Sequence, residues 1–560
     1  MTEIVESARP VLEIADLAIQ FESAGDWHRV VHDVAFQISP GEVLAIVGES
    51  GSGKTVSTLA SLGLLGRNAR VTGSVRFQGR EILGAPERVL REIRGRQIAF
   101  IFQEPMTALN PVYRIGRQLV RVLRSRAGLS RAIARARALE LLALVEMPDP
   151  KRAFRSYPHQ LSGGQRQRAL IALAIACDPA LLVADEPTTA LDVTLQAEIL
   201  ELFRRLRDRL DSALILITHD LGVVADTADN VIVMREGEIV ERGTVRDVFE
   251  HPVHPYTRQL LSAVPRLEVR GEAAAEPPRA EPVVRIENAV VEYSRAGRGA
   301  FRAVDRVSFT IGKGEIVGLV GESGSGKTTL AKSLVGLQSF AGGSVEIAGI
   351  QLVGIGGNDL RRLRRRVGFV FQDPGSSLNP RRRIGDSVAE PLRLAGASRT
   401  VIEDRVAEVL DQVKLPADTA TRFPYQLSGG QRQRAGIARA IVMRPDLLIA
   451  DEPTSALDVS VQQRVLEIFE ELQAELGFAC LFVSHDLAVI DRLSSWIVVL
   501  HHGRLVEEGT PDQVIRNPRD PYTQRLIEAI PLPDPAEQRA RRIARLEGLD
   551  RPAALATEAS

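Results

Sequence analysis

The chain has 560 residues, which is longer than a single hydrophobic core usually reaches, so we expect at least two domains. Its 44% hydrophobic and 25% charged residues are typical of folded protein, and no apolar run is long enough to cross a bilayer. The 71 basic and 71 acidic residues cancel and only two distant cysteines are present, so we expect no nucleic-acid partner and no cysteine-ligated metal cluster.

The first half of the chain alternates short apolar segments with amphipathic ones. EVLAIVG (42–48), LLVAD (181–185) and ALILIT (213–218) are typical of strands buried on both faces of a parallel sheet. Residues 117–147 form a long stretch with helical periodicity between the first and the second of these segments. This order predicts an α/β nucleotide-binding core with a helical insertion.

The second half repeats the order of the first, with the strand EIVGLVG (315–321) and the helical stretch 384–413 as counterparts. A repeat this long indicates a duplicated domain. Residues 266–282 are rich in Ala, Glu and Pro, which predicts an exposed linker. We therefore expect a first domain at 10–265, a linker at 266–282, a second domain at 283–533 and an arginine- and alanine-rich tail at 534–560, which we interpret as a surface helix.

The octapeptide GESGSGKT occurs twice, each time directly after a predicted strand. It fits the pattern G-x-x-x-x-G-K-[ST], in which glycines let backbone N–H groups converge on phosphate oxygens. Lys54 and Lys327 would place a cation on the β- and γ-phosphates, and Thr55 and Thr328 would offer a hydroxyl to Mg²⁺. The predicted ATP-binding residues are Gly48, Glu49, Ser50, Gly51, Ser52, Gly53, Lys54 and Thr55, with Gly321, Glu322, Ser323, Gly324, Ser325, Gly326, Lys327 and Thr328 in the second copy.

Each copy also ends an apolar strand in two adjacent carboxylates. Asp185 and Asp451 are candidates to hold Mg²⁺ through water, and Glu186 and Glu452 are candidates to orient or deprotonate the attacking water. Adjacent acids at a strand end are also found in solvated turns. Their place downstream of a phosphate loop in the same domain favours the catalytic interpretation.

The nonapeptide LSGGQRQRA occurs twice and each time runs into a helical pattern. Ser162 and Ser428 stand where a helix N-cap would, and a helix N-terminus presents N–H groups to an anion. Since each domain already has a phosphate loop, a second phosphate-binding element suggests that it binds the nucleotide of the other domain. The candidate residues are Ser162, Gly163, Gly164 and Gln165, with Ser428, Gly429, Gly430 and Gln431.

The order of phosphate loop, glutamine loop, LSGGQ, ADEP, ALD and histidine resembles the ATP-binding cassette family in both halves of the chain. The resemblance implies two P-loop cassettes, each with a RecA-like core, a β subdomain and a helical insertion. It implies an ATPase with ATP and Mg²⁺ as cofactors. It also implies two ATPs sandwiched head to tail, each between the P-loop of one half and the LSGGQ of the other, so that each nonapeptide completes the other half's site.

Further roles follow from the resemblance alone. Glutamines match the loop that senses Mg²⁺ and the transport domain, aspartates match the loop that couples the two sites, and histidines match the switch that contacts the γ-phosphate. These residues are Gln103 and Gln372, Asp192 and Asp458, and His219 and His485. The glutamines are therefore predicted both as catalytic residues and as Mg²⁺ ligands.

An aromatic residue before each P-loop resembles the side chain that stacks on adenine in this family. The matching residues are Phe21 and Tyr293, although Trp27 and Phe301 lie nearby and a core role is an equal alternative. Lysine, glutamate, serine and histidine are present in both copies. We therefore predict two hydrolysing sites.

Cassette ATPases without membrane segments can drive transport, act on ribosomes or repair DNA. The segment 266–282 is unlike the long charged helical linker of the ribosome-acting class, and the repair class carries zinc-binding cysteine clusters. HPVHPYTRQLLSAVP (251–265) and NPRDPYTQRLIEAIP (517–531), together with FQEPMTALNP (102–111), are similar to the peptide/nickel importer branch. A plain domain end is the alternative interpretation of the first two blocks, because proline stops a helix.

The resemblance implies the motor subunit of a bacterial importer, with di- or oligopeptides as the first expectation. Its partners would be two separate integral membrane permeases that dock near Gln103 and Gln372, and a substrate-binding protein outside the cell. The chain would lie peripherally on the cytoplasmic face of the inner membrane. A soluble tandem ATPase acting on ribosomes stays open as the alternative, and the cargo stays open among peptides, glutathione, peptide antibiotics and nickel.

Overall fold

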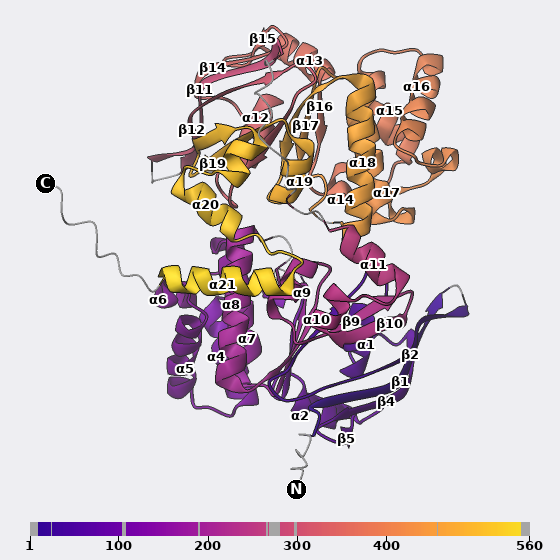
Figure 1. The fold of residues 1–560 in the computed structure, drawn as a ribbon, viewed down its shortest axis with the longest axis vertical. Coiled ribbons are helices and arrows are strands. Elements are labelled where there is room, and N and C mark those ends of the chain that lie inside the picture. Colours follow the sequence, from indigo (N-terminus) through magenta and orange to yellow (C-terminus); the bar gives the residue numbers. More distant parts are fainter. Residues whose placement is uncertain are drawn as a thin grey trace, which may run out of the picture. The chain divides into compact units, whose positions relative to one another are not determined.

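The computed structural model forms two compact units, coloured along the sequence in Figure 1. The first holds the residues up to 191, 195–264 and those from 531 onward, and the second holds 192–194 and 265–530. No helix in the described ranges is both long and apolar enough to span a membrane. Most of the predicted linker and the end of the tail lie outside those ranges, which are 9–23, 25–103, 108–188, 191–264, 267, 280–295, 299–455 and 457–549.

The first unit combines an antiparallel sheet in the order β2-β1-β4-β5 with a larger sheet in the order β10-β9-β3-β8-β7-β6. The larger sheet is parallel from β9 to β6, and β10 is antiparallel at its edge. Every residue of β3, β7 and β8 is buried, as predicted for strands covered on both faces. The strands are β1 (Leu12–Ser23), β2 (Asp26–Ile38), β3 (Val43–Val47), β4 (Ala69–Phe77), β5 (Arg80–Glu81), β6 (Ile98–Ile101), β7 (Leu181–Asp185), β8 (Ala213–Ile217), β9 (Asn230–Arg235) and β10 (Glu238–Thr244).

The predicted helical stretch at 117–147 is two helices, α4 and α5, rather than one. A new helix begins after Ser130, whose hydroxyl accepts a hydrogen bond from the backbone N–H of Ile133 at 3.4 Å and caps α5. Both helices share one apolar core with α7, α8 and the strands β6 and β7. The helices are α1 (Lys54–Ser61), α2 (Glu87–Ile93), α4 (Ile115–Arg126), α5 (Arg131–Leu144), α6 (Pro150–Arg155), α7 (Gly163–Ala174), α8 (Val193–Leu210), α9 (Leu221–Thr227), α10 (Val245–Glu250), α11 (Pro255–Ser262) and, from the tail, α21 (Pro535–Leu549).

The second unit repeats this architecture, with sheets in the orders β12-β11-β14-β15 and β16-β17-β18-β13-β19-β20. The stretch at 384–413 is again two helices, α15 and α16. The strands are β11 (Pro282–Arg295), β12 (Gly299–Gly312), β13 (Ile316–Val320), β14 (Gly342–Ile347), β15 (Ile350–Gln351), β16 (Val367–Val370), β17 (Leu447–Asp451), β18 (Ala479–Val483), β19 (Trp496–His501) and β20 (Arg504–Gly509). The helices are α12 (Lys327–Leu334), α13 (Gly357–Arg366), α14 (Pro374–Ser377), α15 (Ile384–Leu394), α16 (Arg399–Gln412), α17 (Gly429–Ile441), α18 (Val459–Leu476), α19 (Leu487–Leu493) and α20 (Pro521–Glu528).

The strand order of the parallel sheets explains why motifs far apart in sequence meet. In the first unit β8 lies between β3 and β7, and in the second β18 lies between β13 and β17. The phosphate loop, the histidine and the paired acids each follow one of three adjacent strands. Because the carboxyl ends of parallel strands lie at one edge, the three motifs gather there.

Candidate nucleotide-binding sites

The segment GESGSGKT of the first unit joins β3 to α1 in a tight curve. Gly48 has a φ of 146°, and a Cβ there would lie 2.1 Å from the carbonyl oxygen of Met234, so only glycine fits. The buried Nζ of Lys54 donates to the carbonyl oxygens of Gly48 at 2.8 Å and Glu49 at 2.7 Å. The loop thus holds a cation beside the N–H groups of a helix N-terminus, an arrangement that suits phosphate oxygens.

The second unit builds the same loop between β13 and α12. Gly321 has a φ of 144°, and a Cβ there would lie 2.2 Å from the carbonyl oxygen of Leu500. Lys327 Nζ donates to the carbonyl oxygens of Gly321 at 2.5 Å and Glu322 at 2.9 Å. Burial lowers the pKa of Lys327, and the negative charge of Glu452 opposes that shift.

A hydroxyl and a carboxylate meet beside each loop. Thr55 Oγ1 donates to Asp185 Oδ1 at 3.0 Å, and Thr328 Oγ1 donates to Asp451 Oδ1 at 3.1 Å. Burial raises the pKa of Asp185 to about 6; the hydrogen bond from Thr55 opposes this rise and the charge of Glu186 adds to it. Burial likewise raises the pKa of Asp451. Hard oxygen donors of this kind are those that Mg²⁺ prefers, so the residues fit that cation.

Glu186 is the centre of a polar cluster in the first unit. Its φ of 46° lies in the left-handed region, which costs a non-glycine residue conformational energy. Its carboxylate accepts a hydrogen bond from Gln103 Nε2 at 2.6 Å, and its Oε1 lies 3.2 Å from His219 Nδ1. Burial acts to lower the pKa of His219, but the hydrogen bond and charge of Glu186 outweigh it and raise that pKa.

The second unit repeats the cluster around Glu452, which has a φ of 49°. Gln372 Nε2 donates to Glu452 Oε2 at 2.8 Å, and His485 Nδ1 lies 3.4 Å from the same oxygen. Burial acts to raise the pKa of Glu452, but the hydrogen bond and charge of His485 outweigh it and lower that pKa. The structure therefore brings the predicted glutamine, glutamate and histidine together in both units.

The first LSGGQ segment opens α7 as predicted. Ser162 is the N-cap, and its Oγ accepts a hydrogen bond from the backbone N–H of Gln165 at 3.3 Å. In return, the Oε1 of Gln165 accepts a hydrogen bond from the backbone N–H of Ser162 at 3.3 Å. The two glycines of the segment differ in what a side chain at their positions would meet. A Cβ on Gly163 would meet nothing within 4 Å, whereas one on Gly164 would lie 3.0 Å from the side chain of Leu195 on α8.

The second LSGGQ segment is built in the same way at the start of α17. Ser428 caps the helix with the same reciprocal bonds to Gln431. A Cβ on Gly430 would lie 2.3 Å from Val461 on α18. The second glycine of each motif therefore serves helix packing, a role that the sequence interpretation had not assigned.

The two predicted adenine-stacking aromatics have different surroundings. Phe21 is half-buried and packs against the core of its unit. Tyr293 is 39% exposed and lies with its hydroxyl 3.5 Å from Thr329 Oγ1, next to the P-loop helix. Asp458 caps α18, since its Oδ1 accepts from the backbone N–H of Val461 at 3.1 Å. Asp192 directly precedes α8.

Each unit also has a tyrosine contact with the P-loop that sequence reasoning missed. The hydroxyl of Tyr256 accepts a hydrogen bond from the backbone N–H of Glu49 at 3.1 Å, and that of Tyr522 accepts from Glu322 N–H at 2.8 Å. Both tyrosines are buried and belong to the Pro-Tyr-Thr blocks that begin α11 and α20. These blocks therefore support the phosphate loop rather than merely ending a domain.

The double variant Tyr256→Phe and Tyr522→Phe is expected to raise the KM for ATP about threefold to tenfold with little change in kcat. The reason is that each substitution deletes the oxygen that accepts a hydrogen bond from a P-loop amide. Steady-state ATP hydrolysis measures both constants. Tyr425→Phe is the matched control, because that tyrosine is 73% exposed. An unchanged KM in the double variant would contradict a supporting role for the two hydroxyls.

Comparison with known proteins gives matches in both units. The profile of the family described as ABC transporter matches residues 31–189 and 304–455. The profile described as Oligopeptide/dipeptide transporter, C-terminal region, matches 240–288 and 506–552.

Two relatives align with nearly the whole chain. It is 42% identical to the glutathione import ATP-binding protein of Pectobacterium atrosepticum, over 97% of this chain and 93% of that protein. It is 40% identical to the oligopeptide transport ATP-binding protein of Mycobacterium tuberculosis, over 94% of this chain and 100% of that protein. Among solved structures, the dimeric cassette MJ0796 bound to ADP and Pi is 31% identical, covering 41% of this chain and 98% of that one, with a TM-score of 0.38.

Proposed function

Because this chain belongs to the ABC transporter family as an ATPase with two cassettes, we propose that it drives the import of peptides or peptide-like molecules through separate membrane permeases. The observation that carries the proposal is the block after each cassette, which matches the oligopeptide/dipeptide transporter C-terminal profile at 240–288 and 506–552. The names of the two relatives, which specify glutathione and oligopeptide import, support a peptide-like cargo.

Both units are proposed to hydrolyse ATP with the same set of groups. Lys54 and Lys327, already held beside loop amides, bind the β- and γ-phosphates. Glu186 and Glu452 orient and deprotonate the attacking water, and each is positioned by its glutamine and histidine. The meeting of a glutamine, a glutamate and a histidine in both units supports two hydrolysing sites.

Mg²⁺ would be held at each site by the threonine hydroxyl and the glutamine, with the aspartate acting through water. These residues are Thr55, Asp185 and Gln103 in the first unit and Thr328, Asp451 and Gln372 in the second. The cation would supply neutralising charge to the phosphates. In the ATP-bound state, the LSGGQ segment of each cassette is proposed to bind the γ-phosphate of the ATP held by the other cassette, through Ser162 or Ser428 and the following amides.

The partners follow from the same proposal. Two integral permeases would dock near Gln103 and Gln372, and a substrate-binding protein would deliver cargo from outside. The chain would lie on the cytoplasmic face of the bacterial inner membrane as a peripheral subunit. Closure of the cassettes on ATP would move the permeases, and hydrolysis would reset them.

Purification from native membranes tests the proposal. The chain with Glu186→Gln and Glu452→Gln, which should lengthen the ATP-bound state, is captured with MgATP, and a chain with Lys54→Ala and Lys327→Ala is captured in parallel. Two integral membrane proteins are expected to copurify with the first chain and to be depleted with the second. Reconstituted in vesicles with the unchanged chain, ATP and the substrate-binding protein, the same permeases should import a labelled di- or tripeptide, with glutathione and Ni²⁺ tested as alternative cargoes.

Two outcomes would contradict the proposal. Recovery of ribosomes without any integral membrane protein would favour a soluble tandem ATPase. Copurification of permeases that transport Ni²⁺ but neither peptides nor glutathione would keep the motor function and overturn the peptide cargo.

A further inference from the structure

The tail of the chain packs on the first unit through the helix α21. Asp534 caps this helix, because its Oδ1 accepts from the backbone N–H groups of Ala536 and Glu537, both at 2.9 Å. The buried Gln538 fixes the approach to the helix, since its Oε1 accepts from the N–H of Leu532 at 2.9 Å. The helix packs against α9 and α10 of the first unit.

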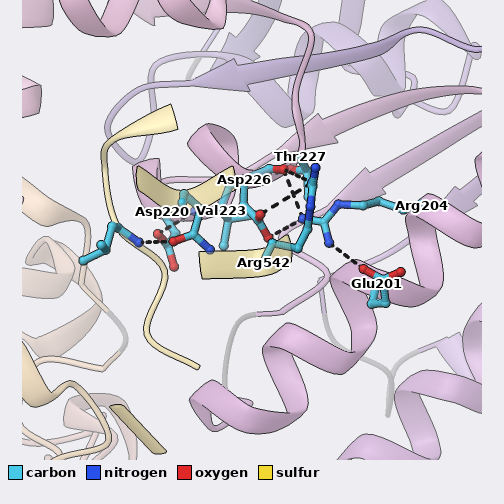
Figure 2. Close-up of polar contacts among 9 residues, drawn as sticks. Glu201, Arg204, Asp220, Val223, Asp226, Thr227 and Arg542 are labelled. Carbon is cyan, nitrogen blue, oxygen red and sulfur yellow. Dashed lines mark hydrogen bonds and ion pairs between the residues drawn. The ribbon is translucent and has the colours of Figure 1, made fainter. Parts of the chain in front are cut away.

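A buried carboxylate on α9 meets the tail. The side chain of Asp226 is 3% exposed, and its Oδ2 forms an ion pair with Arg204 of α8. Arg542 of α21 donates from Nη1 to the carbonyl oxygen of Asp226 at 3.1 Å and lies 3.8 Å from its Oδ1. Figure 2 shows both guanidinium groups converging on Asp226. Among the described residues Asp226 Oδ1 accepts no hydrogen bond, and Arg542 adds a second positive charge near that oxygen, beside the ion pair that Arg204 forms with Oδ2.

A glycine at the start of α9 lets the tail come close. A Cβ on Gly222 would lie 2.6 Å from the carbonyl oxygen and 2.9 Å from the Cβ of Pro531. Backbone and ring atoms at these distances cannot give way as a flexible side chain can. The approach of residue 531 to α9 therefore requires glycine at position 222.

At the equivalent positions of α19, the second unit has neither the glycine nor the aspartate. Counted from the histidine of each unit, Gly222 corresponds to Ala488, and Asp226 corresponds to Arg492. The ion pair is reversed: Arg492 Nε and Nη2 donate to the two carboxylate oxygens of Glu470, at 2.9 and 2.7 Å, and Glu470 corresponds to Arg204. Arg542 would face a cation there, and Pro531 would face a methyl group. The surface is thus matched to the tail in the first cassette alone.

The helix that the tail contacts begins beside the predicted catalytic cluster. Asp220 caps α9 by accepting from the backbone N–H groups of Gly222 at 2.9 Å and Val223 at 3.2 Å, and its Oδ2 accepts from Gln196 Nε2 of α8 at 2.8 Å. His219, which lies 3.2 Å from Glu186, is the residue before this cap. Movement of α9 would therefore be transmitted to His219 through one residue.

We propose that α21 is a brace specific to the first cassette, in which Arg542 acts through Asp226 as a positioning residue that holds α9 and thereby His219. The two ATP sites, which carry the same motifs, would then differ in how firmly the histidine is placed. The inference rests on the ATPase activity of the family and needs neither a permease nor a cargo.

Hydrogen exchange on the purified full-length chain tests the docking. Arg542→Ala and Gly222→Ala are expected to speed amide exchange in α9 by about fivefold or more and to leave α19 unchanged as the reference inside the same molecule. For Gly222→Ala the direction is diagnostic, because alanine by itself stabilises a helix relative to glycine and would slow exchange. Arg539→Ala, which removes an exposed arginine of the same helix, should behave as the unchanged chain, and Arg542→Lys should retain part of the protection.

Single-site turnover tests the positioning of His219. In a chain with Glu452→Gln, Arg542→Ala is expected to lower kcat about threefold to tenfold with the KM for ATP within about twofold, because only the placement of a catalytic group changes. In a chain with Glu186→Gln the same change should have no effect. Unchanged exchange in α9 would overturn the docking, and equal effects in the two backgrounds would overturn the selective positioning.

Discussion

Replacing Glu186 and Glu452 together with glutamine is expected to lower ATP turnover about a thousandfold while ATP affinity stays within about threefold of the unchanged chain. Glutamine preserves the side-chain shape, so its amide oxygen can accept from Gln103 Nε2, which now lies 2.6 Å from Glu186 Oε2. An amide cannot take a proton from water, so the loss falls on the chemical step. Single-turnover hydrolysis and equilibrium ATP binding separate the two quantities.

Each single variant is expected to keep a measurable share of turnover, up to about half, because both units carry the same contacts. Gln372 Nε2 lies 2.8 Å from Glu452 Oε2, and His485 completes that cluster at 3.4 Å. Complete loss of turnover from Glu186→Gln alone would contradict two independently competent sites. Weakened ATP binding in the double variant would contradict a role confined to the chemical step.

The fold class and most of the candidate site could be predicted because their signals are local. Five-residue apolar strands such as β3 and β13 are buried on both faces, and GESGSGKT follows each of them directly. The α/β fold with two cassettes and the ATPase assignment are confirmed by the family match over both halves. The N-cap role of Ser162 was also readable, because capping depends on neighbours within one turn.

The contacts that escaped prediction join distant positions. Tyr256 is 207 residues from Glu49, and Arg542 is 316 residues from Asp226. The tail's composition predicts a helix, but an arginine-rich face is compatible with many acidic partners, so the sequence alone does not select Asp226. The break between α4 and α5 did have a local signal in Ser130, which the continuous helical periodicity obscured.

The two cassettes are alike around the predicted nucleotide site and differ where other segments of the chain contact them. Asp220 and Asp486 cap α9 and α19 with the same pair of backbone amides. Three and seven residues after the histidines, at Gly222 and Asp226, the outer surface changes in shape and charge. Duplication therefore preserved the chemistry while leaving the surroundings of each site free to diverge.

Lys54→Ala and Lys327→Ala together are expected to weaken ATP binding about a hundredfold, because each removes a charged donor worth about 1.5–3 kcal/mol to a phosphate oxygen. Both ammonium groups are buried and already lie within 3 Å of loop carbonyl oxygens, so they are placed before the nucleotide arrives. Isothermal titration with MgATP measures affinity and stoichiometry, and each single variant is expected to leave one tight site.

Lys332→Ala is the control that separates position from charge. Lys332 lies on the same helix α12 as Lys327 but is exposed and outside the loop. Its charge also acts on the carboxylate of Asp451, so its removal takes away a nearby positive charge without emptying the loop. ATP affinity in this variant is expected to stay within about twofold of the unchanged chain, since exposed charges interact weakly through water. Equal weakening of ATP binding by Lys332→Ala and Lys327→Ala would mean that Lys327 acts only through its long-range charge. The assignment of the loop as the phosphate site would then fail.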